Sequence, residues 1–167
     1  IIFRNKLLSA SRTNFHELEH ALLDFKSRGK SIIFYYEIVD TANYALAAAT
    51  ADKIYLNPSG SIYIESTGST RFYFNDFFTK YGIRTVDLQS HEYKTANNTY
   101  TKSRMTDEER ETLSELYSGM QEDVEKRIEK GRKDKLKTSA AEIFNNGPYL
   151  LAEEALEAGL VDALVYE

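Results

Sequence analysis

The sequence predicts an α/β fold in which a parallel β-sheet is flanked by helices. The main observation is that short apolar segments alternate with amphipathic ones, an order typical of parallel strands joined by helical crossovers. A second observation is a long, charged helical segment near the C-terminal third. A chain of 167 residues, 42% of them apolar, is long enough to bury one core. We therefore expect a single domain over residues 1–167.

The first part of the chain predicts three strands and two helices. Ile1–Leu8 and the almost wholly apolar Ser31–Val39 are typical of strands. Between them, Asn14–Ser27 carries an apolar stripe at three- and four-residue steps and predicts an amphipathic helix. The alanine-rich segment Thr41–Ala51 predicts a helix that is packed tightly on several sides. Asp52–Gly60 then predicts a short strand closed by a Pro-Ser-Gly turn.

The second part predicts two further helices and a strand. Arg71–Tyr81 is expected to be a helix ended by Gly82, and residues 83–89 are expected to form a strand. A long helix is expected over Thr106–Lys133, because its Thr-Asp-Glu-Glu start is a capping box. Burial against the protein's own sheet and burial in a subunit interface would both cover the apolar stripe of this helix. The stripe consists of Leu113, Leu116, Met120, Val124 and Ile128.

Composition argues against several classes of function. A net charge of −5 without a basic block argues against nucleic-acid binding, which normally needs a clustered positive surface. The absence of cysteine excludes disulfides, thiolate zinc sites and cysteine nucleophiles. The chain begins at Ile1 and shows neither a signal peptide nor an apolar run of bilayer length. We expect a domain excised from a larger protein whose targeting or anchoring segments lie elsewhere.

Residues 16–20 spell His-Glu-Leu-Glu-His, which matches the zinc-peptidase motif of two histidines one helical turn apart. The apolar stripe of this helix leaves His16 and His20 facing solvent, whereas a catalytic zinc needs a sheltered cleft and a third protein ligand. The one other histidine, His91, is not indicated as that ligand by any spacing. We therefore expect no metal site and interpret the motif as a solvated helix face. The stripe consists of Phe15, Leu18, Leu22 and Phe25.

Three stretches of sequence are more specific. "ANYALAAATADKIYLNPSGSI" is a small-residue helix that runs into an Ala-Asp-Lys-Ile strand and a Pro-x-Gly turn. "EYKTANNTYTKSRMTDEER" is a Tyr-Lys-Thr-Ala block followed by a Met-Thr helix start, and "AEEALEAGLVDAL" contains Gly-Leu-Val-Asp near its end. Together, in this order and at these separations, they resemble the signal peptide peptidase A family, also called protease IV, over nearly the whole chain.

The resemblance implies a layered fold of the crotonase and Clp-protease type. It also implies a serine–lysine peptidase that degrades signal peptides, with a lysine in place of histidine as general base, and Lys94 falls on that lysine. The chemistry requires the amine to be deprotonated near neutral pH, through desolvation or a neighbouring dipole or cation. Tyr93 and Ala96 can shield Lys94, whereas the residues that follow Ala96 are polar. No cofactor is implied.

The chain departs from the family pattern in two places. Ala42 stands where the single-repeat enzymes carry their nucleophilic serine. Residues 8–12 replace a Pro-Gly-Gly turn whose backbone amides can face an oxyanion. Ser90 and Ser103 lie near Lys94 in the sequence but match no family nucleophile. This combination resembles the amino-terminal repeat of the long, double-repeat form, in which the lysine and the serine come from different repeats.

Two hypotheses of function follow from the resemblance. In the first, the chain supplies Lys94 to a split active site whose serine lies in a second repeat outside this chain, so that the chain alone is inactive. In the second, the chain is a non-catalytic assembly domain of the same oligomeric protease. A crotonase-type acyl-thioester enzyme is disfavoured, because the glycine turn that would bind a thioester oxygen is missing. The resemblance further implies signal peptides as partners, a homo-oligomer in the full-length protein, and anchoring in the bacterial cytoplasmic membrane with the catalytic domain in the periplasm.

Overall fold

The computed structural model describes residues 1–4 and 7–166. Its internal contacts divide the chain into two compact units. The first unit combines residues 1–66 with residues 122–167 and contains the β-sheet, and the second unit is formed by residues 67–121. The predicted α/β fold with a parallel sheet and flanking helices is confirmed in the first unit.

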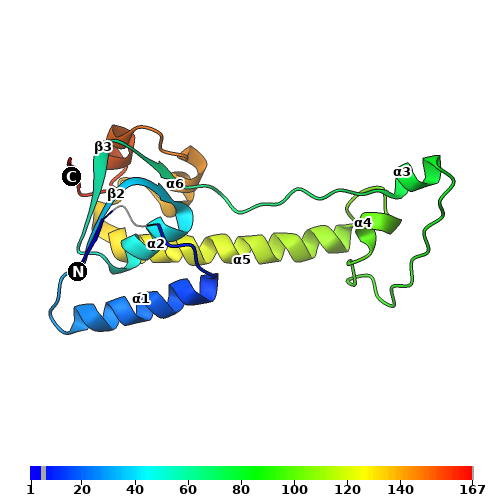
Figure 1. Ribbon diagram of the computed structural model, residues 1–167, viewed down its shortest axis with the longest axis horizontal. Coiled ribbons are helices and arrows are strands. Elements are labelled where there is room, and N and C mark those ends of the chain that lie inside the picture. The colour runs from blue at the N-terminus through cyan, green and yellow to red at the C-terminus, as the bar shows by residue number, and fades with distance from the viewer. Residues whose placement is uncertain (5–6, 167) are drawn as a thin grey trace. The chain divides into compact units, whose positions relative to one another are not determined.

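A four-stranded sheet forms the centre of the first unit, in the order β1-β2-β3-β4 (Figure 1). Every neighbouring pair of strands in it is parallel. The first strand is shorter than the predicted strand Ile1–Leu8, of which residues 5 and 6 lie outside the described part of the chain. The strands are β1 (Ile2–Arg4), β2 (Ile33–Asp40), β3 (Lys53–Tyr63) and β4 (Ala163–Leu164).

The helices follow the predicted pattern for the most part. The amphipathic helix, the alanine-rich helix and the long charged helix are confirmed with closely matching bounds, and the expected Arg71–Tyr81 helix is shortened to Asn75–Lys80. Among the described residues, no helix combines the length and the apolar character needed to cross a membrane. The helices are α1 (Arg12–Ser27), α2 (Thr41–Thr50), α3 (Asn75–Lys80), α4 (Asn98–Thr101), α5 (Asp107–Arg132), the 3-10 helix η1 (Lys133–Lys135), α6 (Ala140–Asn146) and α7 (Ala152–Glu157).

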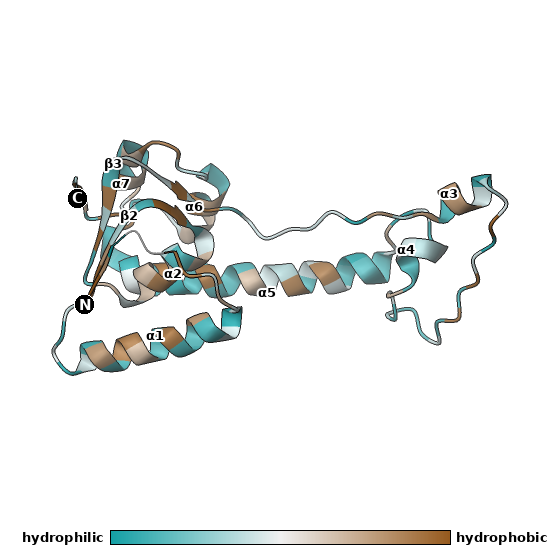
Figure 2. Cartoon of the chain, viewed as in Figure 1, coloured by the Kyte–Doolittle hydropathy of each residue, from teal (hydrophilic) through white to brown (hydrophobic). Residues whose placement is uncertain are grey.

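Helix α1 begins at a side-chain cap and buries one face. The Ser11 hydroxyl accepts a hydrogen bond from the backbone N–H of Asn14 at 3.2 Å, which satisfies one of the free amides of the first turn. Phe15 and Leu22 of its apolar stripe are buried, and Leu18 and Phe25 pack partly against the same core. Figure 2 shows the resulting alternation of apolar and polar residues along α1.

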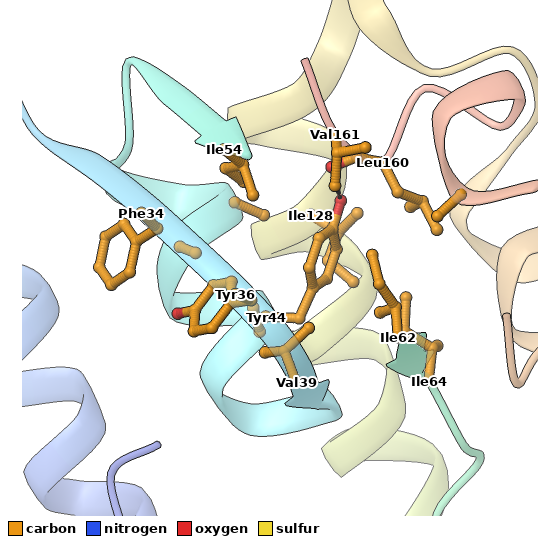
Figure 3. Packing of buried hydrophobic residues seen from close by; sticks show 14 of the residues in the cluster. Phe34, Tyr36, Val39, Tyr44, Ile54, Ile62, Ile64, Ile128, Leu160 and Val161 are labelled. Carbon is orange, nitrogen blue, oxygen red and sulfur yellow. Dashed lines mark hydrogen bonds between the residues drawn. The ribbon is translucent and has the colours of Figure 1, made fainter. Parts of the chain in front are cut away.

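Helix α2 lies in the core of the first unit, as its alanine-rich sequence predicted. The Tyr44 ring lies beside Ile128, Leu160 and Val161 (Figure 3), and its hydroxyl donates a hydrogen bond to the Leu160 carbonyl at 2.7 Å. A Cβ atom at Gly131 of α5 would lie 1.7 Å from the carbonyl oxygen of Ala48 in α2. The close contact between the end of α5 and α2 therefore requires glycine at position 131.

Two of the three family-like stretches interlock in this unit through Asp162. Its carboxylate accepts hydrogen bonds from the backbone N–H of Ile54 and from Arg132 Nη1, both at 2.8 Å, and pairs with Lys135 Nζ at 2.7 Å. Burial would raise the pKa of Asp162, but the hydrogen bonds from Lys135, Ile54 and Arg132 outweigh it and lower the pKa to about 2. Arg132 also donates from Nε and Nη2 to the carbonyl of Gly159. The Gly-Leu-Val-Asp segment is thus tied to the start of β3 and to α5.

The prediction that a Pro-Ser-Gly turn ends β3 is wrong, because β3 continues through this segment to Tyr63. Tyr36 pairs with Leu56, but Ile38 pairs with Ser61, so the segment Asn57–Gly60 bulges out of the ladder. The Asn57 side chain accepts from the N–H of Ser59 at 2.9 Å. A Cβ atom at Gly60 would lie 2.5 Å from the Glu37 carbonyl oxygen, so glycine is needed where the bulge meets β2.

The strand predicted over residues 83–89 is also wrong, because this segment is irregular in the second unit. Ile83, Val86 and Leu88 are exposed there, and the segment pairs with no strand of the sheet. Its apolar alternation fits a strand, but a strand also requires a neighbouring strand to complete its hydrogen bonds.

The apolar stripe of α5 is buried toward its C-terminal end. Ile128 is fully buried and Val124 packs partly against the core, whereas Leu116 is 49% exposed. Burial against the protein's own core, one of the two alternatives, therefore accounts for the C-terminal part of the stripe. Thr106 caps this helix by accepting from the N–H of Glu109 at 3.3 Å.

Candidate active site

Lys94 lies in the second unit, in the irregular segment between α3 and α4. Its side chain is exposed to solvent, and its backbone N–H donates to the His91 carbonyl at 3.0 Å, which forms a turn. The preceding residue, Tyr93, donates from its hydroxyl to Glu111 of α5 at 2.7 Å, and this hydrogen bond raises the pKa of Tyr93. The amine of the predicted base is therefore accessible from outside its own unit.

A cavity of about 300 Å³ lies beside this segment. Lys102 closes one part of its wall by pairing with Asp87 at 3.0 Å, and the hydrogen bond from Lys102 lowers the pKa of Asp87. The cavity is polar, and Asn98 reaches it from the first residue of α4. Its lining residues are Asp87, Gln89, Ser90, His91, Glu92, Asn98, Lys102, Thr106 and Glu108.

The position of the missing serine lies in the first unit, at the first turn of α2. Ala42 is exposed there, in the wall of a separate pocket of about 520 Å³. Residues 8–10, which belong to the segment 8–12 that stands where the family has its glycine turn, form another part of the same wall. The structure therefore brings together both places at which the sequence departs from the catalytic pattern. The remaining lining residues are Leu7, Phe15, Asp40, Thr41, Tyr63 and Glu65.

A buried asparagine fixes the geometry of this pocket. Asn43 Oδ1 accepts from the backbone N–H of Leu8 at 2.8 Å, and Asn43 Nδ2 donates to the Leu8 carbonyl at 3.2 Å. The same Nδ2 lies 3.0 Å from both oxygens of Asp40, the N-cap residue of α2. Because the Leu8 amide is already bonded to Asn43, it does not point a free N–H at an oxyanion.

The hydroxyl groups near Ala42 and near Lys94 are either hydrogen-bonded to other groups or exposed to solvent. Thr41 Oγ1 donates to the Tyr63 carbonyl and accepts from the N–H of Glu65, both at 3.1 Å. In the second unit, the Ser103 hydroxyl is hydrogen-bonded to Asp76, and Ser90 is exposed. None of these arrangements pairs a serine hydroxyl with a lysine amine among the described residues.

The prediction that both histidines of the zinc-like motif face solvent holds for His20 but is wrong for His16, which is half-buried beside Asp123 of α5. His20 is exposed, and His16 Nε2 lies 3.5 Å from Asp123, which also pairs with Arg12 at 2.8 Å. No group of three potential metal-binding side chains is found within residues 1–4 and 7–166. His16 thus lies at a polar contact between α1 and the part of α5 that belongs to the first unit.

Sequence reasoning missed the two buried polar residues of the second unit, Asn98 and Glu109. The sequence indicates only that the residues after Ala96 are polar and that Glu109 belongs to the capping box of α5. Asn98 is 1% exposed and Glu109 is 2% exposed, and they are hydrogen-bonded to each other at 2.9 Å. A single asparagine in a polar run carries no signal of burial, so the sequence alone did not identify this pair.

Residues 24–167 match the family profile described as "Peptidase family S49". The chain is also 26% identical over 164 residues to "Serine protease SPPA, chloroplastic" from Arabidopsis thaliana. That alignment covers 96% of this chain but 23% of the plant protein, so the chain spans about a quarter of the length of this relative. Both findings agree with the resemblance inferred from the three stretches of sequence.

Proposed function

The chain belongs to peptidase family S49, and from this we propose that it forms half of a serine–lysine peptidase that degrades signal peptides. Lys94 is the general base in this proposal, and the nucleophilic serine lies in a second repeat outside this chain. The observation that carries the proposal is that Ala42, which has no nucleophilic atom, occupies the pocket at the first turn of α2. A lysine that is retained without a serine in the matching pocket suggests that the serine is supplied by another repeat.

The proposed chemistry assigns one proton-transfer role to Lys94. The neutral amine accepts the proton of the serine hydroxyl as its oxygen attacks the peptide carbonyl carbon. The resulting ammonium gives this proton to the leaving amine when the peptide C–N bond breaks and the acyl ester remains. Water then attacks the ester with the same lysine as base, which releases the acid and restores the serine. Because Lys94 is exposed in this chain, we expect the serine-bearing repeat to supply the desolvation that a neutral amine requires.

The alternative is a non-catalytic assembly domain of the same protease. The exposure of Lys94 favours this alternative, because an exposed lysine is the ordinary state of that side chain. The two hypotheses differ in one measurable respect. A split active site requires the Lys94 amine for turnover, whereas an assembly domain does not.

The test is the Lys94→Ala variant of the full-length protein, assayed with a fluorogenic signal-sequence peptide. We expect kcat/KM to fall by about 100- to 10,000-fold, the usual contribution of a general base. We expect the free energy of unfolding to change by less than about 1 kcal/mol, because the side chain is exposed. Lys80→Ala is the matched control, since Lys80 is an exposed lysine in α3 of the same unit. Wild-type turnover in Lys94→Ala would remove Lys94 from the mechanism and favour the assembly domain.

A second experiment concerns the 167-residue chain by itself. We expect it to fold but not to hydrolyse the peptide, because a general base without a nucleophile leaves no covalent route. Mixing it with the serine-bearing repeat should restore weak activity, and fusing the two should restore more, because a linker raises the effective concentration of one repeat around the other. Turnover by the chain alone that is blocked by serine-directed inhibitors would mean that the nucleophile lies within it.

The proposal includes the cellular setting implied by the resemblance. We propose that the full-length protein is a homo-oligomer anchored in the bacterial cytoplasmic membrane with its catalytic domain facing the periplasm. Fractionation of cells, followed by protease treatment of intact spheroplasts, measures both anchoring and orientation. Recovery in the soluble cytoplasmic fraction would contradict this part of the proposal.

A further inference from the structure

The second unit has a polar centre. Within residues 67–121, all of which the structure describes, the two fully buried residues are Asn98 and Glu109. The apolar side chains of this unit are half-buried or exposed, as in the aromatic cluster in which Phe77 contacts Phe78 and Tyr81. A buried carboxylate carries a desolvation cost, which an apolar pair filling the same space would avoid.

The contacts of this pair explain how the cost is partly offset. Asn98 Nδ2 donates to Glu109 Oε2 at 2.9 Å. Arg71 Nη1 lies 3.5 Å from Glu109 Oε1 and supplies a positive charge that is 40% exposed. Tyr73 lies beside the same carboxylate, and burial together with Glu109 raises the pKa of Tyr73. The carboxylate is therefore paired, but at the cost of ordering several side chains around it.

The same pair closes the segment that carries Lys94. Gln89 Nε2 donates to Asn98 Oδ1 at 3.3 Å, so the two ends of residues 89–98 meet at the Asn98 amide. The N–H of Asn98 donates to the Thr95 carbonyl at 3.0 Å, which orders the return of the chain after Lys94. Lys94 thus lies within a loop of ten residues whose neck is fixed to α5 through Glu109.

The far side of the loop is held to the same helix. The Tyr93 hydroxyl donates to Glu111 of α5 at 2.7 Å. Two carboxylates in the first turns of α5, one buried and one exposed, therefore hold the residues on either side of Lys94. These two contacts with α5 restrict where the Lys94 backbone can lie.

We propose that Asn98 and Glu109 are positioning residues that hold the Lys94 loop against α5, so that the amine is presented in one place. This inference rests on the proposed role of Lys94 as general base. Neither Asn98 nor Glu109 contacts the reacting atoms in this proposal, and both act through the loop. A displacement of the amine by about 1 Å is enough to cost about 100-fold in rate, because proton transfer needs hydrogen-bonding distance.

The test uses the full-length protein and the same fluorogenic peptide. We expect Asn98→Ala and Glu109→Ala to lower kcat by about 10- to 100-fold, with KM changed by less than about threefold. Glu109→Gln should recover most of the loss, because its side-chain oxygen still accepts from Asn98. The matched controls are Asn97→Ala and Glu115→Ala, which should keep wild-type kcat. Both control residues are exposed, and Asn97 makes no side-chain capping bond.

A double-mutant cycle with Lys94→Ala separates positioning from general damage. If Asn98 acts through Lys94, then adding Asn98→Ala to Lys94→Ala should leave the residual activity unchanged. A further loss of about the same factor in both backgrounds would overturn the proposal, because it would mean that Asn98 acts independently of Lys94. Full activity in Lys94→Ala itself would instead contradict the proposed function, so the two failures are distinguishable.

A variant outside the buried pair covers the case in which Asn98→Ala or Glu109→Ala does not fold. Gln89→Ala removes the bond at the loop neck from a half-buried position and leaves the Asn98–Glu109 bond in place. We expect kcat to fall several-fold while the melting temperature stays unchanged. Wild-type kcat in Gln89→Ala, whether Asn98→Ala is folded and fully active or does not fold, would overturn the positioning role.

Discussion

Replacing Asp162 by asparagine should lower the free energy of unfolding by about 2 to 4 kcal/mol at pH 7. The carboxylate has an ordinary pKa of 3.8 that is lowered to about 2 in the folded chain. At about 1.4 kcal/mol per pH unit, this difference corresponds to about 2 kcal/mol of stability that the neutral amide cannot supply. The further cost arises because Arg132, which is 3% exposed, would be left buried without its counter-charge.

The dependence on pH provides the sharper test of this value. Because the folded-state pKa lies below the unfolded one, the contribution of Asp162 is fully present above about pH 5 and is lost as the pH falls from about 4 through about 2. About half of it should remain at pH 3. The difference between the wild type and Asp162→Asn should therefore shrink on going from pH 7 to pH 3, as measured by denaturant unfolding with circular dichroism.

Asp24→Asn is the matched control for the loss of a carboxylate. Asp24 pairs with Arg28 at 2.6 Å, but both side chains are more than half exposed, at 59% and 66%. Removing such a surface pair should cost less than about 0.5 kcal/mol. A cost for Asp162→Asn as small as that of Asp24→Asn, or one that does not change between pH 7 and pH 3, would refute the view that this charge network stabilises the fold.

Two further predictions concern packing and the zinc-like motif. Gly131→Ala should destabilise the chain by more than about 2 kcal/mol, because the new Cβ would lie 1.7 Å from a backbone oxygen. Gly119→Ala in the same helix, where nothing lies within 4 Å, should instead stabilise the chain by about 0.5 to 1 kcal/mol. Thermal unfolding measures both changes, and a shift of the two melting temperatures in the same direction would contradict this prediction. His16→Ala combined with His20→Ala should change neither peptide turnover nor metal content, since no third metal ligand lies beside the two histidines within residues 1–4 and 7–166. Stoichiometric zinc that elemental analysis finds in the wild type but not in the double variant would contradict this.

The fold could be predicted from the sequence wherever local pattern and packing agree. Each of the segments α1, α2 and α5 has a sequence pattern that is typical of a helix and not of a strand, and all three helices are confirmed. The wrong predictions concern segments whose structure depends on whether a neighbouring strand pairs with them. Pro58-Ser59-Gly60 has the composition of a turn, but the ladder with β2 resumes beyond it. Residues 83–89 have the alternation of a strand, but they have no strand beside them.

The candidate site could be predicted in part. The three stretches of sequence indicated the family, and Ala42 and residues 8–10 are brought to one pocket as their family positions imply. The surroundings of Lys94 could not be predicted, because they depend on side-chain contacts between an irregular segment and the helices α4 and α5. Asn98 becomes buried through its contact with Glu109, eleven positions later, and neither residue type indicates burial by itself.

Two of the three family-like stretches form the core of the first unit, whereas the other one carries Lys94. This separation is what a split active site would require. The first and third stretches meet at Asp162 and Tyr44, so they build the core of the first unit whether or not the chain is catalytic. Ala42, by contrast, is exposed on the pocket wall, where a serine hydroxyl would meet solvent and disturb no packing. The lack of a serine there is therefore not a requirement of folding. The second stretch contains Lys94 and the buried pair of Asn98 and Glu109, so the costly polar packing of the second unit lies next to the residue that we propose as the general base.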